Sequence, residues 1–391
     1  MSHLNRHLAI IAGESSGDTH GAALMRSLRD LDPKICFIGK GGPKMEKEAL
    51  ATGGRLDNWI AEAGVLGLWD VLRHYGYFRS KFHLLLAELT ATRPEAVILV
   101  DYPGFNLRLA KALRKRGLKT KIIYYISPQV WAWNRRRIPE MARTLDLMIC
   151  IFPFEKRLYE SSGLRTVFVG HPMAKELQTV PRSERDEALL GLFPGSRERE
   201  VRKIFPLMMD AARLIHRSRP EIRFEAAAAS PTHAALMEEM AKDESFTVTI
   251  TTGTSRKLMR RASAALVCSG TATLEAACLG LPHALVYKVA TLTYEVGIRV
   301  IQIPYLGIVN ILANRPVVRE FIQHNATPAA LADESLRLLN NTEARDRLVA
   351  DLAQTVELLR TPEGDPAHPP SNRTASAVME CLETSPLSPL E

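Results

Sequence analysis

The sequence predicts an α/β protein with two doubly wound domains in tandem, each a parallel sheet covered by helices on both faces. Short segments that are apolar throughout alternate with amphipathic segments of helical spacing, which is typical of buried parallel strands and their crossover helices. The alternation is interrupted at residues 172–187 by a stretch rich in Pro, Lys, Glu and Arg, and then it restarts. The length of 391 residues suits two domains of ordinary size.

The first half of the chain predicts one domain over residues 1–172, followed by a linker over 173–187. Its expected strands span residues 7–12, 35–39, 96–100, 121–126, 147–152 and 166–170, and its clearest helices span 19–30 and 105–116. Because these strand segments are apolar on both faces, helices must cover both sides of the sheet.

The second half predicts another such domain over residues 188–345. Its expected strands span residues 188–192, 224–229, 247–251, 264–268 and 282–287, and its expected helices span 199–217, 256–261 and 271–279. Ligands of doubly wound sheets bind at the carboxyl ends of the strands, so we expect two domains that face an interdomain cleft.

The C-terminal residues 346–391 are expected to form helices and a Pro-rich tail. A short helix near residues 372–382 ends this part of the chain. The sequence leaves open whether that helix packs back on the first domain of its own chain or on a partner chain.

Composition indicates a globular protein with an anionic partner. Hydrophobic residues make up 46% and charged residues 24%, while the net charge of +8 favours nucleic acid, a phosphorylated substrate or an anionic membrane surface. The five cysteines are widely spaced and odd in number, which predicts buried thiols in a reducing cytosol. No uninterrupted apolar segment is long enough to span a bilayer, and no metal-ligand spacing occurs, so we expect a soluble or peripheral protein without a metal.

The segment SGTATLE at residues 269–275 follows a strand-like run and opens a helix. Ser269, Gly270 and Thr271 would offer backbone N–H groups at the positive end of a helix dipole, an arrangement that favours a phosphate. Glu275, one turn into the helix, can accept hydrogen bonds from two ribose hydroxyls. The segment therefore predicts a site for a nucleoside diphosphate, with an ordinary Ser-capped helix as the alternative.

A second candidate anion contact follows the first strand of the second domain. Arg197 stands on the Gly-bearing turn PGSR at residues 194–197, and its bidentate fork can clamp a diphosphate. The acidic and basic residues that alternate over residues 198–203 predict a solvated face of salt bridges.

Two further candidate sites directly follow strands of the first domain. Asp101 follows a buried strand, where a carboxylate beside apolar groups has a raised pKa and can act as a general base. The alternative is a helix N-cap, although Asp101 lies several residues before the expected helix. The loop GESSGD at residues 13–18 suits a polar, sugar-like ligand, with capping of the first helix by Ser16 or Asp18 as the alternative.

Basic residues cluster in two segments of the sequence, and each segment has its own interpretation. Between residues 64 and 86, Trp69, Tyr75, Phe78 and Phe82 recur among basic side chains, as on a surface that rests on lipid headgroups or, alternatively, in an interior core helix. The basic run at residues 108–121 is interpreted as a solvated helix face. Without interleaved aromatic residues it does not favour nucleic acid.

Taken together and in order, these segments resemble the lipid A disaccharide synthase family of GT-B glycosyltransferases, from about residue 8 to residue 340. The resemblance is carried by AGESSGD at 12–18, GVLG at 64–67, DYPGFN at 101–106, YISPQVWAW at 125–133, FPFE at 152–155, VGHP at 169–172, PGSR at 194–197, SGTATLE at 269–275 and NILA at 310–313.

The resemblance implies an inverting transfer of 2,3-diacylglucosamine from UDP-2,3-diacylglucosamine to 2,3-diacylglucosamine 1-phosphate, which forms a β-1,6-linked disaccharide and UDP without a metal or cofactor. It implies that Asp101 removes the proton from the acceptor 6-hydroxyl. Arg197 and the helix N-terminus would offset charge on the departing diphosphate, and Glu275 would hold the ribose.

The remaining implied contacts divide between the two substrates. Ser196, Asn310 and Gln323 would lie on the donor side, with Glu14 and Ser16 on the acceptor side. The implied location is cytoplasmic, peripheral on the inner membrane of a Gram-negative cell, with no nucleic acid and with a homodimer left open. The competing interpretations are another UDP-sugar GT-B enzyme, such as the transferase that makes the peptidoglycan lipid precursor, and a non-catalytic nucleotide-sugar-binding protein.

Overall fold

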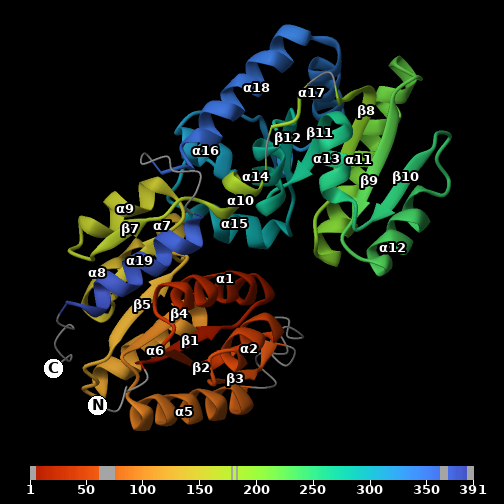
Figure 1. Ribbon diagram of the computed structural model, residues 1–391. Helices are drawn as coiled ribbons and strands as arrows, with labels where there is room; N and C mark the ends of the chain where they lie inside the picture. The colour runs from red at the N-terminus through yellow and green to blue at the C-terminus, as the bar shows by residue number, and fades with distance from the viewer. Residues whose placement is uncertain (1–5, 61–74, 178, 182–183, 362–368, 385–391) are drawn as a thin grey trace. The chain divides into compact units, whose positions relative to one another are not determined.

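The computed structural model describes residues 6–60, 75–177, 179–181, 184–361 and 369–384 of the chain. These residues form two compact units (Figure 1). Unit 1 comprises Met1–Pro172 and Thr361–Glu391, and unit 2 comprises Met173–Arg360. None of the helices in the described ranges combines the length and hydropathy needed to cross a membrane. The five cysteines are buried and free.

Unit 1 contains a parallel sheet of seven strands. They are β1 (Arg6–Ala12), β2 (Ile35–Gly41), β3 (Arg55–Asn58), β4 (Ala96–Val100), β5 (Lys121–Tyr125), β6 (Leu147–Cys150) and β7 (Thr166–Phe168). Their order across the sheet is β3-β2-β1-β4-β5-β6-β7. Every residue of β4 and β5 is buried, as expected of central strands covered on both faces.

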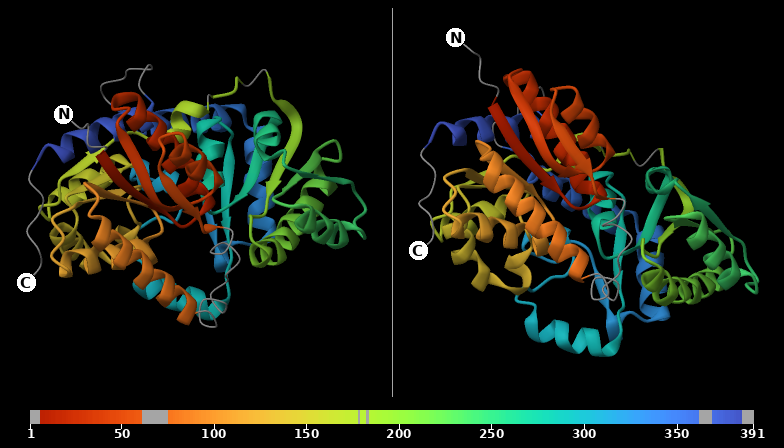
Figure 2. Two further views of the ribbon diagram at one scale, coloured as in Figure 1. Left: turned by 60° about the horizontal axis from the view of Figure 1, so that its bottom comes forward. Right: turned by 90° about the horizontal axis from the view of Figure 1, so that it is seen from below.

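Helices from both ends of the chain cover this sheet. They are α1 (Ser15–Leu31), α2 (Pro43–Leu50), α5 (Tyr75–Thr92), α6 (Pro103–Lys115), α7 (Val130–Trp133), α8 (Ile138–Thr144), α9 (Pro153–Glu160) and α19 (Pro370–Leu382). Figures 1 and 2 show α1 and α19 over one face and α5 and α6 over the other. The C-terminal helix α19 packs beside α1, where the Ser27 hydroxyl donates to Asn372 Oδ1 at 2.8 Å.

Unit 2 repeats the arrangement with six parallel strands. They are β8 (Asp186–Phe193), β9 (Arg223–Ala228), β10 (Val248–Thr252), β11 (Ala262–Cys268), β12 (His283–Tyr287) and β13 (Glu320–Ile322), in the order β10-β9-β8-β11-β12-β13. Its helices are α11 (Glu198–Ser218), α12 (Pro231–Ala241), α13 (Ser255–Arg261), α14 (Thr271–Cys278), α15 (Thr291–Val300), α16 (Ile308–Ala313), α17 (Pro328–Asn340) and α18 (Thr342–Glu357), with the short 3-10 helix η3 (Gln323–Asn325). The chain enters this unit through α10 (Pro172–Glu176).

Each sheet reverses its winding between two neighbouring strands. In unit 1 the chain builds β1, β2 and β3 outward in one direction and then places β4 on the other side of β1. In unit 2 the same reversal lies between β8 and β11. At such a switch point the strand order reverses, and ligands of α/β sheets bind outside the carboxyl ends of the two strands.

The predicted fold class is confirmed, and the sequence prediction missed only two of these strands. Both β3 and β13 lie at an edge of their sheet and are four and three residues long. Three of the four residues of β3 are exposed, so no apolar segment marks it in the sequence. An edge strand pairs on one side only and needs no apolar surface on both faces.

The alternative interpretation of residues 13–18, in which Ser16 or Asp18 caps the first helix, is wrong. Helix α1 begins at Ser15, and its N-cap is Glu14. Asp18 is buried and serves the next helix instead, because its carboxylate accepts the backbone N–H groups of Gly42 at 3.0 Å and Met45 at 2.9 Å at the start of α2. A carboxylate there satisfies N–H groups left open at a helix start and complements the helix dipole.

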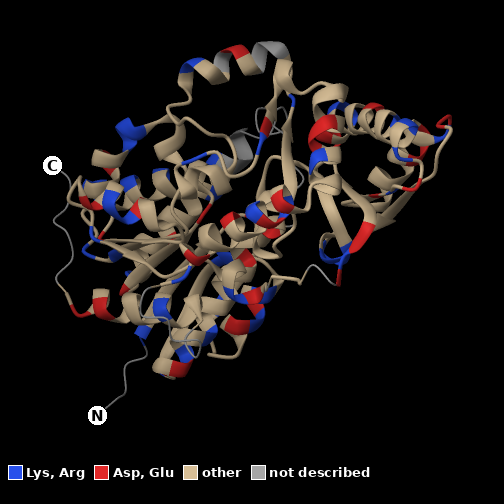
Figure 3. Cartoon of the chain, turned by 90° about the horizontal axis from the view of Figure 1, so that it is seen from above, with Lys and Arg blue, Asp and Glu red and all other residues tan. Residues whose placement is uncertain are grey.

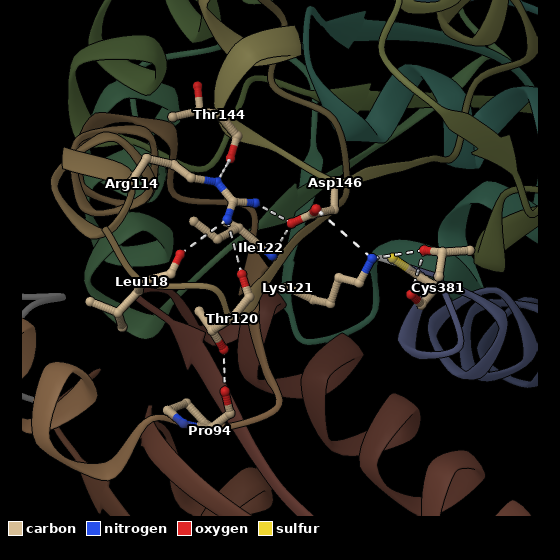
Figure 4. Close-up of polar contacts among 10 residues, drawn as sticks. Pro94, Arg114, Leu118, Thr120, Lys121, Ile122, Thr144, Asp146 and Cys381 are labelled. Atoms are coloured by element: carbon tan, nitrogen blue, oxygen red, sulfur yellow. Dashed lines mark hydrogen bonds and ion pairs between the residues drawn. The ribbon is translucent and has the colours of Figure 1, made fainter. Parts of the chain in front are cut away.

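The basic run at residues 108–121 is also not the uniformly solvated face that the sequence predicted. Arg114 is fully buried and forms an ion pair with Asp146 (Figure 4). Its guanidinium also donates to the carbonyl oxygens of Thr144 at 2.9 Å and Thr120 at 3.0 Å. A buried guanidinium is tolerated only when its N–H groups are paired in this way.

The Asp146 carboxylate also contacts two further groups. Asp146 accepts the backbone N–H of Ile122 at 2.7 Å, and its Oδ1 lies 4.0 Å from Lys121 Nζ (Figure 4). Lys121 in turn donates to the Thr384 hydroxyl, just beyond α19, at 2.7 Å. The network therefore joins α6, the start of β5, the turn before β6 and the C-terminal segment.

Another buried acid fixes the carboxyl end of β5. Glu155 is buried at the start of α9 and accepts hydrogen bonds from Ser127 Oγ and Trp131 Nε1, both at 2.9 Å. Burial raises the pKa of the Glu155 carboxyl to about 8, although the bonds from these two groups lower it. Ile126, directly before Ser127, has a φ of 67°, which is unusual for a β-branched residue.

We expect Asp146→Asn to lower the free energy of unfolding of unit 1 by about 3–5 kcal/mol, because it leaves the Arg114 charge buried without its partner. All four tryptophans lie between residues 59 and 133, so tryptophan fluorescence in a urea titration reports on this unit. Glu140→Gln, which breaks the exposed Lys111–Glu140 pair, is the control and should cost less than about 1 kcal/mol. Equal losses for the two variants would contradict the role of the buried pair.

We also expect the stability of unit 1 to fall by about 1 kcal/mol between pH 7 and pH 8 through Glu155 alone. Its pKa of about 8 in the folded chain exceeds the value of 4.5 for a free carboxyl, so the folded state holds a proton that the unfolded state has lost. The contribution of Glu155 to the free energy of unfolding is fully present below pH 4.5 and is lost as the pH rises through 8.

The measurement is the urea midpoint followed by tryptophan fluorescence at several pH values. Glu155→Gln should flatten the dependence, whereas Glu160→Gln, an exposed site on the same helix, should retain it. A wild-type midpoint that stays constant or rises between pH 7 and pH 8 would show that the buried carboxyl is ionised in the folded chain.

Candidate active site

Asp101 lies at the switch point of unit 1, directly after β4. Its φ of 47° and that of Tyr102, 50°, place two consecutive non-glycine residues in the left-handed region. Such residues persist only where the surroundings hold them. Here the Asp101 carbonyl accepts hydrogen bonds from Asn106 Nδ2 at 2.7 Å and from the Tyr124 hydroxyl at 2.6 Å.

The loops after β1 and β4 meet at this point. A Cβ atom on Gly13 would lie 2.2 Å from Cδ1 of the Tyr102 ring, so only glycine fits there. Glu14 follows as the exposed N-cap of α1, and Ser16 is exposed in its first turn. The structure thus brings Glu14 and Asp101 to the same edge of the sheet.

The surroundings of Asp101 favour its protonated form. Burial raises the pKa of the Asp101 carboxyl, and the negative charge of Glu14 raises it further. The backbone N–H of Tyr102 lowers it, which is the smallest of the three effects. A carboxylate with raised proton affinity at a strand end is suited to general-base catalysis.

Arg197 lies at the switch point of unit 2, as the N-cap of α11. Its side chain is 75% exposed and pairs with Glu200, with 2.8 Å between Arg197 Nη1 and Glu200 Oε1. The other oxygen of Glu200 accepts the backbone N–H groups of Ser196 at 3.1 Å and Arg197 at 3.2 Å. A Cβ atom on Gly195, whose φ is 117°, would lie 2.5 Å from that oxygen. The solvated face predicted here holds for Arg202 and Glu198, but Glu200 closes the turn.

Helix α14 follows β11, the strand beside β8 in the sheet. Its N-cap is Gly270 with a φ of 146°, and no side chain in the described ranges caps the helix. Ser269 donates its backbone N–H to the Val286 carbonyl at 3.0 Å. The alternative of an ordinary Ser-capped helix is therefore wrong. An uncapped N-terminus leaves N–H groups and the positive end of the dipole, at Thr271 and beyond, for an anion.

The loops after the neighbouring strands β8 and β11 contact each other, so Arg197 and the start of α14 lie at the same edge of the sheet. Cys268 Sγ, at the end of β11, lies 3.3 Å from the position of a Cβ atom on Gly195. Burial raises the pKa of the Cys268 thiol to about 12, and the charge of Glu200 contributes. This thiol is therefore protonated at neutral pH.

Glu275 is paired with a residue that the sequence prediction missed. Its side chain is 19% exposed, and Oε1 accepts a hydrogen bond from Arg256 Nε at 3.0 Å. Arg256 opens α13 and also forms an ion pair with Glu176 of α10. No signal in the sequence marks this pairing, because the three residues lie on separate elements.

Asn310 and Gln323 have partners within the protein. The buried Asn310 amide donates to Val318 O and Glu320 Oε1, both at 2.8 Å, and its oxygen accepts the N–H groups of Val317 and Val318. Gln323, at a φ of 53°, exchanges two 3.0 Å hydrogen bonds with the Val289 backbone. Contact of either residue with the donor substrate stays a prediction. For Asn310 such a contact would require one of these hydrogen bonds to be exchanged.

A cavity of about 700 Å³ lies beside Gln323. Its lining includes Lys203 and Asp210 of α11 and Lys288 of the loop after β12. A second cavity, of about 540 Å³ around Asn325, contains none of the predicted site residues. Within the described ranges, no three His, Cys, Asp or Glu side chains are placed to hold a metal ion.

The predicted membrane contacts lie only partly in the described structure. Trp69 is outside the described residues, and Tyr75 and Phe78 lie in α5 without described side chains. Phe82 is half-buried, and its ring packs edge-on against Phe105 at 5.4 Å between centroids. For Phe82 this packing favours the alternative, a core helix. Basic and acidic residues are intermixed along the ribbon rather than collected in one stretch (Figure 3).

Comparison with known sequences identifies the family. A family model described as lipid-A-disaccharide synthetase matches residues 8–364. The chain is 38% identical over 389 residues to the lipid-A-disaccharide synthase of Geobacter sulfurreducens, which covers 97% of this chain and 98% of that protein. It is 35% identical over 357 residues to the lipid-A-disaccharide synthase of Coxiella burnetii, with 89% and 93% covered.

Solved structures share the fold at much lower identity. The chain is similar to MurG of Acinetobacter baumannii, with a TM-score of 0.55 at 13% identity over 96% of this chain and 100% of that chain. It is also similar to UDP-GlcNAc 2-epimerase of Neisseria meningitidis bound to UDP-GlcNAc, with a TM-score of 0.55 at 11% identity over 96% and 99%. At these identities the likeness shows the fold alone.

The sequence and structural comparisons agree with the resemblance that the motifs indicated. The match to the family model includes the loops at both switch points, and the two Rossmann-like units are those of a GT-B fold. The chain belongs to the lipid-A-disaccharide synthase family of glycosyltransferases.

Proposed function

We propose that the chain transfers 2,3-diacylglucosamine from UDP-2,3-diacylglucosamine to 2,3-diacylglucosamine 1-phosphate, with inversion, and so forms a β-1,6-linked disaccharide 1-phosphate and UDP. Membership of the family makes the chain a glycosyltransferase of lipid A synthesis. The observation that carries the proposal is the contrast between the two switch points. A half-buried acid with a raised pKa occupies one, and an arginine beside an uncapped helix N-terminus occupies the other.

In unit 2 the proposed reaction uses the uncapped end of α14 and Arg197 to bind the donor diphosphate. As the bond between the sugar and the diphosphate breaks, negative charge develops on the departing oxygen, and N–H groups and a guanidinium stabilise it. The pair between Arg197 and Glu200 is exposed and is therefore worth less than about 1 kcal/mol, so a phosphate can replace the carboxylate as the partner of Arg197. Glu275 accepts hydrogen bonds from the ribose, and Ser196 lies beside the diphosphate.

In unit 1 the Asp101 carboxylate accepts the proton of the acceptor 6-hydroxyl. The hydroxyl oxygen forms a bond to the anomeric carbon as the bond from that carbon to the diphosphate oxygen breaks. One displacement of this kind inverts the anomeric configuration. Burial and the charge of Glu14 raise the pKa of Asp101, which strengthens it as a base. Glu14 and Ser16 are the proposed polar contacts of the acceptor sugar.

Both proposed substrates carry acyl chains, so we further propose peripheral contact with an anionic membrane on its cytoplasmic side. The segment at residues 64–86, where aromatic residues stand among basic ones, is the proposed contact, apart from Phe82, whose ring packs on Phe105. The net charge of +8 is consistent with attraction to anionic lipid. A homodimer is compatible with this arrangement and is left open.

We expect Asp101→Asn to lower turnover by at least about 100-fold, because the amide cannot accept the proton, while leaving the affinity for UDP unchanged. Thin-layer chromatography of the disaccharide 1-phosphate, formed in detergent from the two lipid substrates, measures turnover. Calorimetry with UDP measures binding. Turnover within a few-fold of the wild type would refute the role of Asp101, and an unmodified chain that binds UDP without forming product would refute the acceptor assignment.

We expect Glu14→Gln to move the acidic limb of the pH–rate profile to lower pH. The negative charge of Glu14 raises the pKa of the Asp101 carboxyl, so its removal lowers that pKa and keeps the base ionised in more acidic solution. The measurement is kcat/KM as a function of pH below 7 for both proteins. Thr19→Ala, also exposed and one turn further along α1, is the control and should leave the limb in place. A limb that stays fixed in Glu14→Gln would exclude Asp101 as the group that titrates.

A further inference from the structure

Arg256 joins two carboxylates of unit 2 that come from different helices. Its Nε and Nη2 both lie 3.0 Å from Oε1 of Glu275 on α14, and its Nη1 pairs with Glu176 on α10. Both contacts with Glu275 use the same oxygen, and no residue in the described part of the chain bonds to the second oxygen, Oε2. A guanidinium presents its donors in a rigid fork and fixes the direction of a carboxylate better than an ammonium group does.

Charge and burial keep this bridge intact at neutral pH. The Glu275 side chain is 19% exposed, whereas those of Arg256 and Glu176 are 44% and 59% exposed. The hydrogen bond with Glu176 raises the pKa of Arg256 most, and Glu275 raises it further. Arg256 therefore remains a cation beside Glu275 and balances the charge of that half-buried carboxylate.

Glu176 is itself held in place by the chain that follows α10. The backbone N–H of Val180 donates to the Leu279 carbonyl at 3.0 Å, just beyond the C-terminal end of α14. A Cβ atom on Gly280, whose φ is 64°, would lie 2.5 Å from Cγ2 of Thr179. The segment that carries Glu176 is thus fastened to the helix whose N-terminus is the proposed phosphate site.

We propose that Arg256 is the positioning residue for Glu275: it holds this carboxylate so that Oε2 accepts a hydrogen bond from a ribose hydroxyl of the donor nucleotide, and Glu176 anchors Arg256. This inference rests on the proposed function, which assigns the ribose to Glu275. It predicts that Arg256 contributes to the distinction between a ribonucleotide and a 2′-deoxyribonucleotide, and much less to binding of the diphosphate itself.

The test compares UDP with 2′-deoxy-UDP by calorimetry, using the full-length chain and its variants. The wild type should bind UDP on the order of tenfold more tightly, because a hydrogen bond to a carboxylate is lost with the 2′-hydroxyl. Arg256→Ala should reduce this ratio toward one. Arg256→Lys should give an intermediate ratio, because a lysine retains the charge without the fork.

Three further variants separate positioning from general weakening. Arg197→Ala should weaken the binding of both nucleotides by the same factor and leave the ratio of their affinities unchanged. Lys257→Ala, the exposed neighbour of Arg256 on α13, should alter neither affinity. Glu176→Gln should lower the ratio less than Arg256→Ala, because the pair with Glu275 remains.

The outcomes distinguish this inference from the proposed function. If Arg256→Ala and Arg256→Lys keep the wild-type ratio, the positioning role is refuted while the nucleotide site stands. If Glu275→Gln also keeps that ratio, the ribose assignment of Glu275 is refuted together with the inference. If the wild type binds neither nucleotide, the proposed function itself fails.

Discussion

The reversal of winding in each parallel sheet is the constraint on which both halves of the site depend. Parallel strands need crossover helices, and these helices cover both faces of each sheet, so polar ligands have access at the strand ends and in such sheets bind at the carboxyl ends. The reversals between β1 and β4 and between β8 and β11 bring two loops together there. The contacts are so close that Gly13 meets the Tyr102 ring and Gly195 meets Glu200, which leaves no room for a Cβ atom at either glycine.

The same architecture supports opposite electrostatic environments at the two places. In unit 1, burial and the neighbouring Glu14 raise the pKa of Asp101, as a general base requires. In unit 2, the start of α14 and the exposed Arg197 provide positive potential, as a departing diphosphate requires. The difference lies in the loop residues alone, because the strands beneath them are apolar in both units.

The sequence predicted the interior strands, the position of Asp101 at a strand end and that of Glu275 one turn into a helix, because each depends on a local pattern: an apolar segment, a turn and a helix start. It could not predict β3, an edge strand with three exposed residues of four, or β13, an edge strand of only three residues. It also could not predict the pairing of Arg114 with Asp146, 32 residues away, or of Arg256 with Glu176, 80 residues away. Such partners are set by the packing of separate elements, and no spacing in the sequence encodes them.

The two helix starts in unit 2 explain why one of them is suited to bind an anion. At α11, Glu200 accepts the backbone N–H groups of Ser196 and Arg197, so its carboxylate closes the turn before this helix. At α14, Gly270 provides no side chain, and no side chain among the described residues caps the helix. Arg197 extends from the start of α11 on an exposed side chain. An incoming diphosphate therefore gains the open N–H groups of α14 and the charge of Arg197 without displacing the carboxylate that closes the turn before α11.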